Sequence, residues 1–164
     1  MEEWNTRLIG DQPCCLRLFL GALQQITDHI VFMHQHHIAH LDICLRNIVT
    51  NGHGIYSIID YETSRQYDPL DKAPRIYKHR AQEIPPEIER GEASNPFKID
   101  IWALAVTFLQ AVQLTGYHIP ELVELSMSML QEDPHKRPSA KTVQIKFDLI
   151  ASSLSQFRAL DCTA

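Results

Sequence analysis

Cysteine, glycine and long apolar runs are all scarce in this chain. Of its 164 residues, only four are cysteines: Cys14, Cys15, Cys44 and Cys162. They follow neither zinc-ribbon nor disulfide-framework spacing, so we expect reduced thiols in a cytoplasmic or nuclear protein. No apolar run reaches the roughly 18 residues that a membrane span requires, and the acidic start does not read as a signal peptide. We therefore expect no membrane partner.

Neither sign of charge is strongly in excess. The net charge is −5 at pH 7, and 21% of the residues are charged while 45% are hydrophobic. These values are ordinary for a globular protein. Without an excess of basic residues, we expect no nucleic-acid partner. The length suits one domain with its own core.

Histidine is the residue type in most evident surplus, with nine in the chain. Four of them lie close together, at His34, His36, His37 and His40. No carboxylate or cysteine stands beside them at a spacing typical of zinc sites, so we expect no metal centre there.

Apolar periodicity predicts four helices. Residues 16–34 carry one apolar stripe and predict an amphipathic helix. Residues 98–113 are apolar nearly all round, which predicts a buried central helix. Residues 120–131 and 139–158 predict two further helices. The chain is therefore expected to be mainly α.

A small β ribbon is expected between the first two helices. Residues 48–49 and 56–59 are strand-like, and the turn between them contains two glycines. Residues 62–97 are expected to be mostly irregular, because prolines interrupt them repeatedly. The predicted fold class is mainly α with a small two-stranded β ribbon.

Three oxygen-bearing side chains stand in an order suited to phosphoryl transfer. The stretch from His40 to Asn47 reads H-x-D-x-x-x-x-N, and a short apolar run then ends at Asp60. Asp42 can orient an attacking hydroxyl and accept its proton. Asn47 and Asp60 are hard ligands of the kind that Mg²⁺ prefers.

Three later motifs give this pattern a resemblance to the protein kinase family. Residues 85–87 read P-P-E, residues 100–102 read D-I-W, and residues 133–138 read D-P-H-K-R-P. Protein kinases carry similar motifs in this order after the catalytic loop. The resemblance implies a kinase-like C-terminal lobe with a catalytic loop at 40–47, a metal motif at 60–62, an activation segment at 60–87 and the central helix at 98–113.

The resemblance also implies roles for individual residues. Asp42 and Arg46 would be catalytic, and Asn47 and Asp60 would bind Mg²⁺ and, through it, ATP. His40 and Asp100 would be structural, and Glu87 would pair with Arg137 in a buried salt bridge.

Several features depart from the family pattern. The chain has no G-x-G-x-x-G and no V-A-I-K-type strand, so the resemblance covers a C-terminal lobe that lacks the N-terminal lobe. Leu41 replaces the Arg of H-R-D, Cys44 replaces a common Lys, and Tyr61-Glu62 replaces Phe-Gly. We therefore expect a partial kinase-like domain at 1–160 with a tail at 161–164, which binds ATP weakly or not at all as this chain alone.

Three functions remain open on the sequence. The first is an ATP-dependent protein phosphotransferase of the Ser/Thr type, incomplete and inactive as the isolated chain. The second is a pseudokinase scaffold that binds a protein partner, with association through the surface that the missing lobe would cover. The third is a small-molecule phosphotransferase of the aminoglycoside or choline kinase type. The wording of the motifs is also similar to the kinase-like proteins of mushroom-forming fungi.

Overall fold

The computed structural model describes residues 16–157; the predicted tail at 161–164 lies outside this range. The α-helices are α1 (Leu16–Gln35), α2 (Pro86–Glu89), α3 (Pro96–Thr115), α4 (Pro120–Met129) and α5 (Ala140–Phe157). The strands are β1 (Ile38–Ala39), β2 (Ile48–Thr50), β3 (Tyr56–Ile58) and β4 (Arg65–Gln66). Two short 3₁₀ turns, η1 (Leu45–Asn47) and η2 (Pro134–Lys136), complete the described elements.

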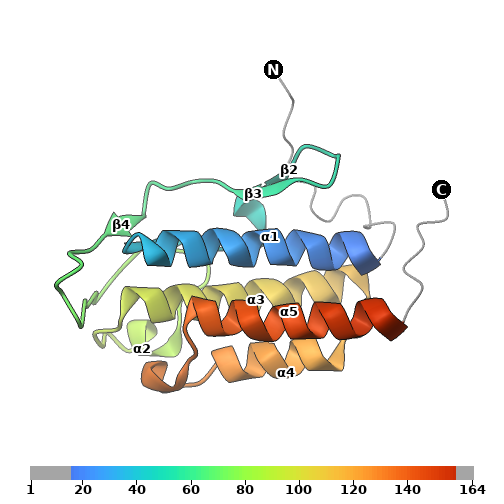
Figure 1. Cartoon of the computed structure of the whole chain (residues 1–164). Helices are drawn as coiled ribbons and strands as arrows, with labels where there is room; N and C mark the ends of the chain where they lie inside the picture. The colour runs from blue at the N-terminus through green and yellow to red at the C-terminus, as the bar shows by residue number, and fades with distance from the viewer. Residues whose placement is uncertain (1–15, 158–164) are drawn as a thin grey trace.

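The long helices lie side by side and enclose the main core. Helix α1 packs against α3 and α5, and α4 packs against α3 and α5 (Figure 1). The predicted stripe of α1 is buried along its whole length, at Leu16, Phe19, Leu20, Leu23, Ile26, Ile30 and Met33. The prediction of an amphipathic helix from this periodicity is confirmed.

Helix α3 is the buried centre predicted from its uniformly apolar sequence. Asn95 caps its start by accepting a hydrogen bond from Phe97 N (2.9 Å), and Gly116 ends it with a φ of 71°. The expectation of a buried helix at 98–113 fails at Trp102, which is only half-buried although its neighbours Ile101 and Ala103 are buried. By length and composition α3 is the one helix among residues 16–157 that could cross a membrane, but buried core helices meet the same criteria.

The predicted ribbon is present as β2 and β3. The two strands pair antiparallel, with Ile48 opposite Ile58 and Thr50 opposite Tyr56. Positive φ angles at Gly52 (76°) and Gly54 (84°) close the turn, which explains why glycines stand there. The ribbon lies across one side of α1 (Figure 1).

A second two-stranded sheet was not predicted. Strand β1 pairs antiparallel with β4, with Ile38 opposite Gln66 and Ala39 opposite Arg65. Strands of two residues have no measurable periodicity, so the sequence gives no local signal for them. The fold is therefore mainly helical with two small antiparallel sheets instead of one.

A second, smaller hydrophobic cluster lies away from the main core. Its buried members are Ala39, Leu41, Ile76, Ile88 and Ile99. They come from β1, the loop after it, the segment before α2, α2 itself and α3. This cluster joins the 40–47 loop to the long segment at 60–87, and both carry candidate site residues.

Candidate active site

The loop that starts at His40 is held by hydrogen bonds to Asp100 of helix α3. Asp100 is fully buried, and its Oδ2 accepts a hydrogen bond from His40 N while its Oδ1 accepts one from Leu41 N (2.8 Å each). His34 Nε2 donates to the same carboxylate (2.9 Å). Leu41 has a φ of 67°, a conformation that costs a residue with a side chain about 1–2 kcal/mol. Asp100 thus holds a strained peptide in place immediately before Asp42.

His40 has a positioning role in this loop. Its ring is buried, and its Nδ1 accepts a hydrogen bond from Asp42 N (3.3 Å). Burial lowers the pKa of His40, although the nearby carboxylates of Asp100 and Asp42 act in the opposite direction. Because Nδ1 accepts the hydrogen bond from Asp42 N, the proton of the neutral ring lies on Nε2.

Asp42 and Asn47 are joined directly. Asn47 Nδ2 donates to Asp42 Oδ2 (3.0 Å) and to Asp42 O (2.8 Å). Asp42 Oδ1 accepts a hydrogen bond from Gln82 N (2.9 Å). A carboxylate has about four acceptor positions, so Asp42 can still accept from a hydroxyl. The carbonyl oxygen of the Asn47 side chain is left available as a ligand.

Asp60 lies beside this pair. Ile59 N donates to Asn47 O (2.8 Å), which fixes the end of the ribbon against the loop. Asp60 follows with a φ of 67°, and its exposed side chain makes no hydrogen bond or ion pair with any residue of the described range. A carboxylate without a protein partner suits Mg²⁺, which is usually held by one or two carboxylates together with phosphate oxygens and water. Residues 16–157 contain no cluster of three or more His, Cys, Asp or Glu that could hold a metal alone.

Arg46, in the turn η1, contacts the segment at 60–87. The resemblance implied a role near the transferred phosphoryl group, and in the structure Arg46 Nε donates to Gln82 Oε1 (2.5 Å). Gln82 therefore contacts both Arg46 and Asp42. Sequence reasoning missed Gln82, because nothing in the local sequence signals contacts to residues 36 and 40 positions away.

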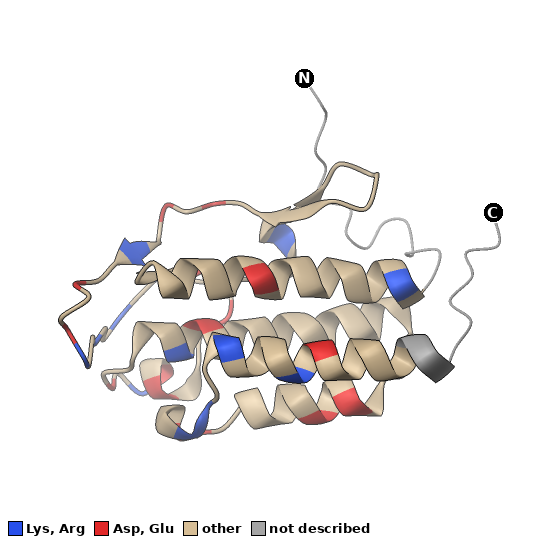
Figure 2. Cartoon of the chain, viewed as in Figure 1, with Lys and Arg blue, Asp and Glu red and all other residues tan. Residues whose placement is uncertain are grey.

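Tyr61 folds back towards helix α1. Its hydroxyl donates to Ile58 O (2.7 Å) and lies 3.0 Å from His29 Nε2, and its ring centre is 5.2 Å from that of His40. Ile55, Ile59 and Tyr61 are large apolar side chains that are 52%, 41% and 46% exposed. Strands β2 and β3 carry no charged residue (Figure 2).

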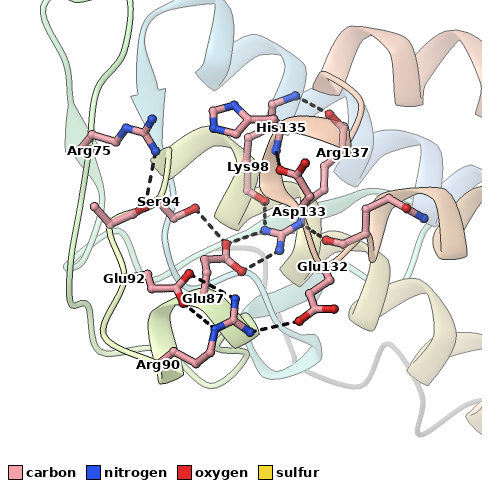
Figure 3. Close-up of polar contacts among 12 residues, drawn as sticks. Arg75, Glu87, Arg90, Glu92, Ser94, Lys98, Glu132, Asp133, His135 and Arg137 are labelled. Atoms are coloured by element: carbon pink, nitrogen blue, oxygen red, sulfur yellow. Dashed lines mark hydrogen bonds and ion pairs between the residues drawn. The ribbon is translucent and has the colours of Figure 1, made fainter.

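Glu87 and Arg137 form a buried ion pair at the end of the segment 60–87 (Figure 3). Arg137 Nη1 and Nη2 donate to the two Glu87 carboxylate oxygens (2.8 and 2.7 Å), and the side chains are 0% and 2% exposed, respectively. Arg137 also donates to the carbonyls of Gln131 (2.8 Å) and Lys98 (3.2 Å). Ser94 Oγ adds a hydrogen bond to Glu87 (2.9 Å).

The electrostatics of this pair favour the ionised carboxylate. Burial alone would raise the pKa of Glu87, but the hydrogen bonds from Arg137, from the backbone and from Ser94 outweigh it, so the pKa lies below its ordinary value. The guanidinium carbon of Arg137 also lies 4.8 Å from the centre of the Trp102 ring. The half-buried Trp102 therefore serves as a stacking surface for the ion pair.

Three histidines, the buried His40 and the half-buried His29 and His79, predict a pH dependence of stability. Burial is the main cause that lowers the pKa values of His29, His40 and His79. Between these lowered pKa values and the ordinary value of about 6.5, the unfolded chain binds more protons than the folded one, so the free energy of unfolding decreases as the pH is lowered.

We expect the free energy of unfolding to decrease between about pH 7 and pH 5, as measured by urea denaturation at constant ionic strength. His79→Gln should flatten this slope, whereas substitution of the exposed His53 by Gln should leave it unchanged. A stability that is constant over this range would contradict the expectation.

Comparison with known proteins places the chain among kinases. A profile of the protein kinase domain matches residues 18–120. The chain is 27% identical over 145 residues to a Wee1-like protein kinase of Arabidopsis thaliana, a match that covers 76% of this chain and 28% of that protein. It is 26% identical over 156 residues to the dual specificity protein kinase zak2 of Dictyostelium discoideum, covering 84% of this chain and 24% of that protein.

A third relative is the striated muscle preferentially expressed protein kinase of Danio rerio. It is 29% identical over 130 residues, covering 79% of this chain and 4% of that protein. The chain therefore spans 28% or less of the length of these three relatives.

Proposed function

Because the chain belongs to the protein kinase family, we propose that residues 16–157 form the C-terminal lobe of an ATP-dependent protein phosphotransferase. In this proposal the 164 residues bear the base and the metal ligands, but not the parts that cover the ATP phosphates. The narrower similarity to the kinase-like proteins of mushroom-forming fungi belongs to the same proposal.

The observation that carries the proposal is the hydrogen-bonded connection from Asp42 to the end of the ribbon. Asn47 donates to Asp42 through its side chain (3.0 Å) and accepts from Ile59 N through its backbone (2.8 Å). A candidate base and two candidate Mg²⁺ ligands, which are separated in sequence, thereby share one edge of the domain. Proximity and fixed orientation of such groups are the main requirements of phosphoryl transfer.

Each side chain has a distinct task in this proposal. Asp42 accepts a hydrogen bond from the substrate hydroxyl and orients it, while Asn47 fixes the Asp42 carboxylate and offers its carbonyl oxygen to the metal. Asp60 supplies the carboxylate ligand. Asn47 and Asp60 would hold Mg²⁺, which would supply positive charge to offset the charge that develops during transfer.

Paramagnetic Mn²⁺ tests the metal ligands directly. We expect Mn²⁺ at millimolar concentration to broaden the amide NMR signals of Asn47 and Asp60, and Asp60→Asn to remove the effect. Asp68→Asn changes an exposed carboxylate of the same segment and is the matched control. Equal broadening in wild type and Asp60→Asn would overturn the assignment of Asp60.

Thermal and chemical unfolding with Mg²⁺ and ATP test whether this chain alone is incomplete. A ligand present at its Kd adds only about 0.4 kcal/mol to the free energy of unfolding, and we expect no more than this at 1 mM ATP. A gain of about 2.7 kcal/mol would mean a Kd near 10 μM and would contradict the claim of incompleteness.

The same experiments, with an added phosphorylation assay, test two other functions. A partner-binding pseudokinase is favoured by the exposed Ile55, Ile59 and Tyr61, and it would be supported if Mn²⁺ bound nowhere near Asp60. A small-molecule phosphotransferase would be supported if the chain phosphorylated an aminoalcohol and no protein.

A further inference from the structure

A cavity lies on the side of the domain formed by the end of α1 and the starts of α3 and α5. Its volume is about 330 Å³, within the range of small-molecule sites. The walls are mostly apolar, with Val31, Phe97, Ile101 and Ala140 among them. The charged or titratable side chains that line it are His34, Lys98 and Lys141.

The Lys98 ammonium has two hydrogen-bond acceptors but no negatively charged partner within the described range. Its Nζ donates to the backbone carbonyls of Arg137 and of Pro138, the latter at 3.2 Å. An ammonium has three N–H groups, so one is left over. No carboxylate lies within ion-pair distance of Lys98 in the part of the chain that the structure describes. Burial, and then the charge of Arg137, lower the pKa of Lys98, as expected for a cation that lacks an anion.

The charge of this cavity differs from that of two others on the same domain. The groove between α4 and α5 includes Glu121 and Glu124 beside Lys146. The groove near η2 mixes both signs, with Glu92, Glu132 and Asp133 beside its basic residues. The cavity at Lys98 is lined by cations and by no Asp or Glu. Although the chain has a net charge of −5, the positive lining of this cavity favours the binding of an anion.

We propose that this cavity binds a small amphiphilic carboxylate, in which an aromatic ring or a short branched alkyl group is joined to the carboxylate. The carboxylate pairs with Lys98 and Lys141, and the apolar group lies against Val31, Phe97 and Ile101. The site is separate from Asp42 and Asp60 and does not depend on the proposed phosphotransferase activity.

The shape of the apolar wall supports an aromatic group. Phe97 meets His34 edge to face, with ring centres 4.9 Å apart, and lies 5.7 Å from Tyr67 in a similar arrangement. Aromatic pairs in such geometry are more favourable than their buried area alone suggests. A ligand ring can extend this series of aromatic contacts.

The cavity is also connected to the loop at 40–47 through hydrogen bonds of His34 and Asp100. His34 lines it and donates to Asp100, and Asp100 holds His40 N and Leu41 N. A ligand that contacts His34 therefore touches the group that orients the peptide before Asp42.

NMR titration with 3-phenylpropionate tests the proposal on the chain as it is. We expect shifts of the amide signals of His34, Phe97 and Ala140, with a Kd on the order of 1 mM for a ligand of this size. The neutral analogue 3-phenylpropanol and the cationic 3-phenylpropylamine should bind at least about fivefold more weakly, which is the effect of one charge pair.

Variants of the exposed lining residues distinguish binding in this cavity from nonspecific electrostatic attraction to the domain surface. Lys141 and Gln35 are exposed, so substituting them should leave the fold intact. Lys141→Glu and Gln35→Trp should each weaken 3-phenylpropionate at least about fivefold, by charge reversal and by blocking the opening respectively. Lys146→Glu makes the same charge change on the same helix outside the cavity and should have no effect.

Three results would overturn the proposal. They are shifts located elsewhere in the domain, equal affinity for 3-phenylpropanol, and equal weakening by Lys141→Glu and Lys146→Glu. Because the titration reads signals around Lys98 and uses no metal or nucleotide, a failure here is distinct from a failure of the Mn²⁺ experiment at Asp60.

Discussion

Replacing Arg137 by methionine is expected to lower the free energy of unfolding by about 3–5 kcal/mol. The change leaves Glu87 charged and buried, without the two hydrogen bonds of 2.7 and 2.8 Å that now hold it (Figure 3). It also removes the hydrogen bonds that Arg137 donates to the carbonyls of Gln131 and Lys98. Urea denaturation followed by circular dichroism measures the loss, which is a large part of the roughly 5–15 kcal/mol that stabilises a typical domain.

Matched variants show whether burial is the cause. Arg90→Met removes ion pairs to Glu92 and Glu132 that are exposed, so it should cost far less than Arg137→Met. Arg137→Lys keeps the charge without the forked geometry and should fall between wild type and Arg137→Met. The double variant Glu87→Leu/Arg137→Met should recover part of the loss, because no charge is then left buried. Equal losses for Arg90→Met and Arg137→Met would contradict this account.

Replacing Asp100 by alanine is expected to cost about 2–6 kcal/mol, because it leaves two buried N–H groups, those of His40 and Leu41, without an acceptor. Leu41 also loses the partner that holds its φ at 67°. Asp100→Asn should cost less, since one oxygen remains to accept a hydrogen bond.

Hydrogen exchange separates a local effect from a global one. In wild type the amides of His40 and Leu41 should exchange slowly, and in Asp100→Asn they should exchange faster than the amides of α1. Asp148→Asn, which alters a carboxylate on α5 that accepts from Gln24 (3.0 Å), is the control and should leave both amides protected. Unchanged protection of Leu41 in Asp100→Asn would show that α3 does not hold the loop.

The sequence predicts those parts of the fold that depend on periodicity. The stripe of α1 and the uniformly apolar α3 follow from spacing, and the glycines at 52 and 54 mark the turn of the ribbon. Helix α2 was missed because Pro85 and Pro86 were treated as interruptions, whereas a proline is favourable in the first turn of a helix. The β1–β4 sheet was missed because two-residue strands carry no pattern.

The site shows a similar division. The order of Asp42, Asn47 and Asp60 was legible in the sequence, and the motifs also suggested that Glu87 would pair with Arg137. The contacts of Gln82 with Asp42 and Arg46, and of His34 with Asp100, join residues 36 to 66 positions apart. Such contacts depend on how whole helices pack together. No local sequence motif therefore predicts them.

The dependence of the loop at 40–47 on Asp100 has a consequence for the order of events in folding. His40 and Leu41 are fastened by a residue about 60 positions further along the chain, so closing this contact requires a long loop to be ordered first. During synthesis, helix α1 and the ribbon are complete well before α3 leaves the ribosome. We therefore expect the loop around Asp42 to stay unfixed in the nascent chain until α3 docks, while α1 presents its apolar stripe to solvent. That interval is when this domain is most exposed to aggregation and to capture by chaperones.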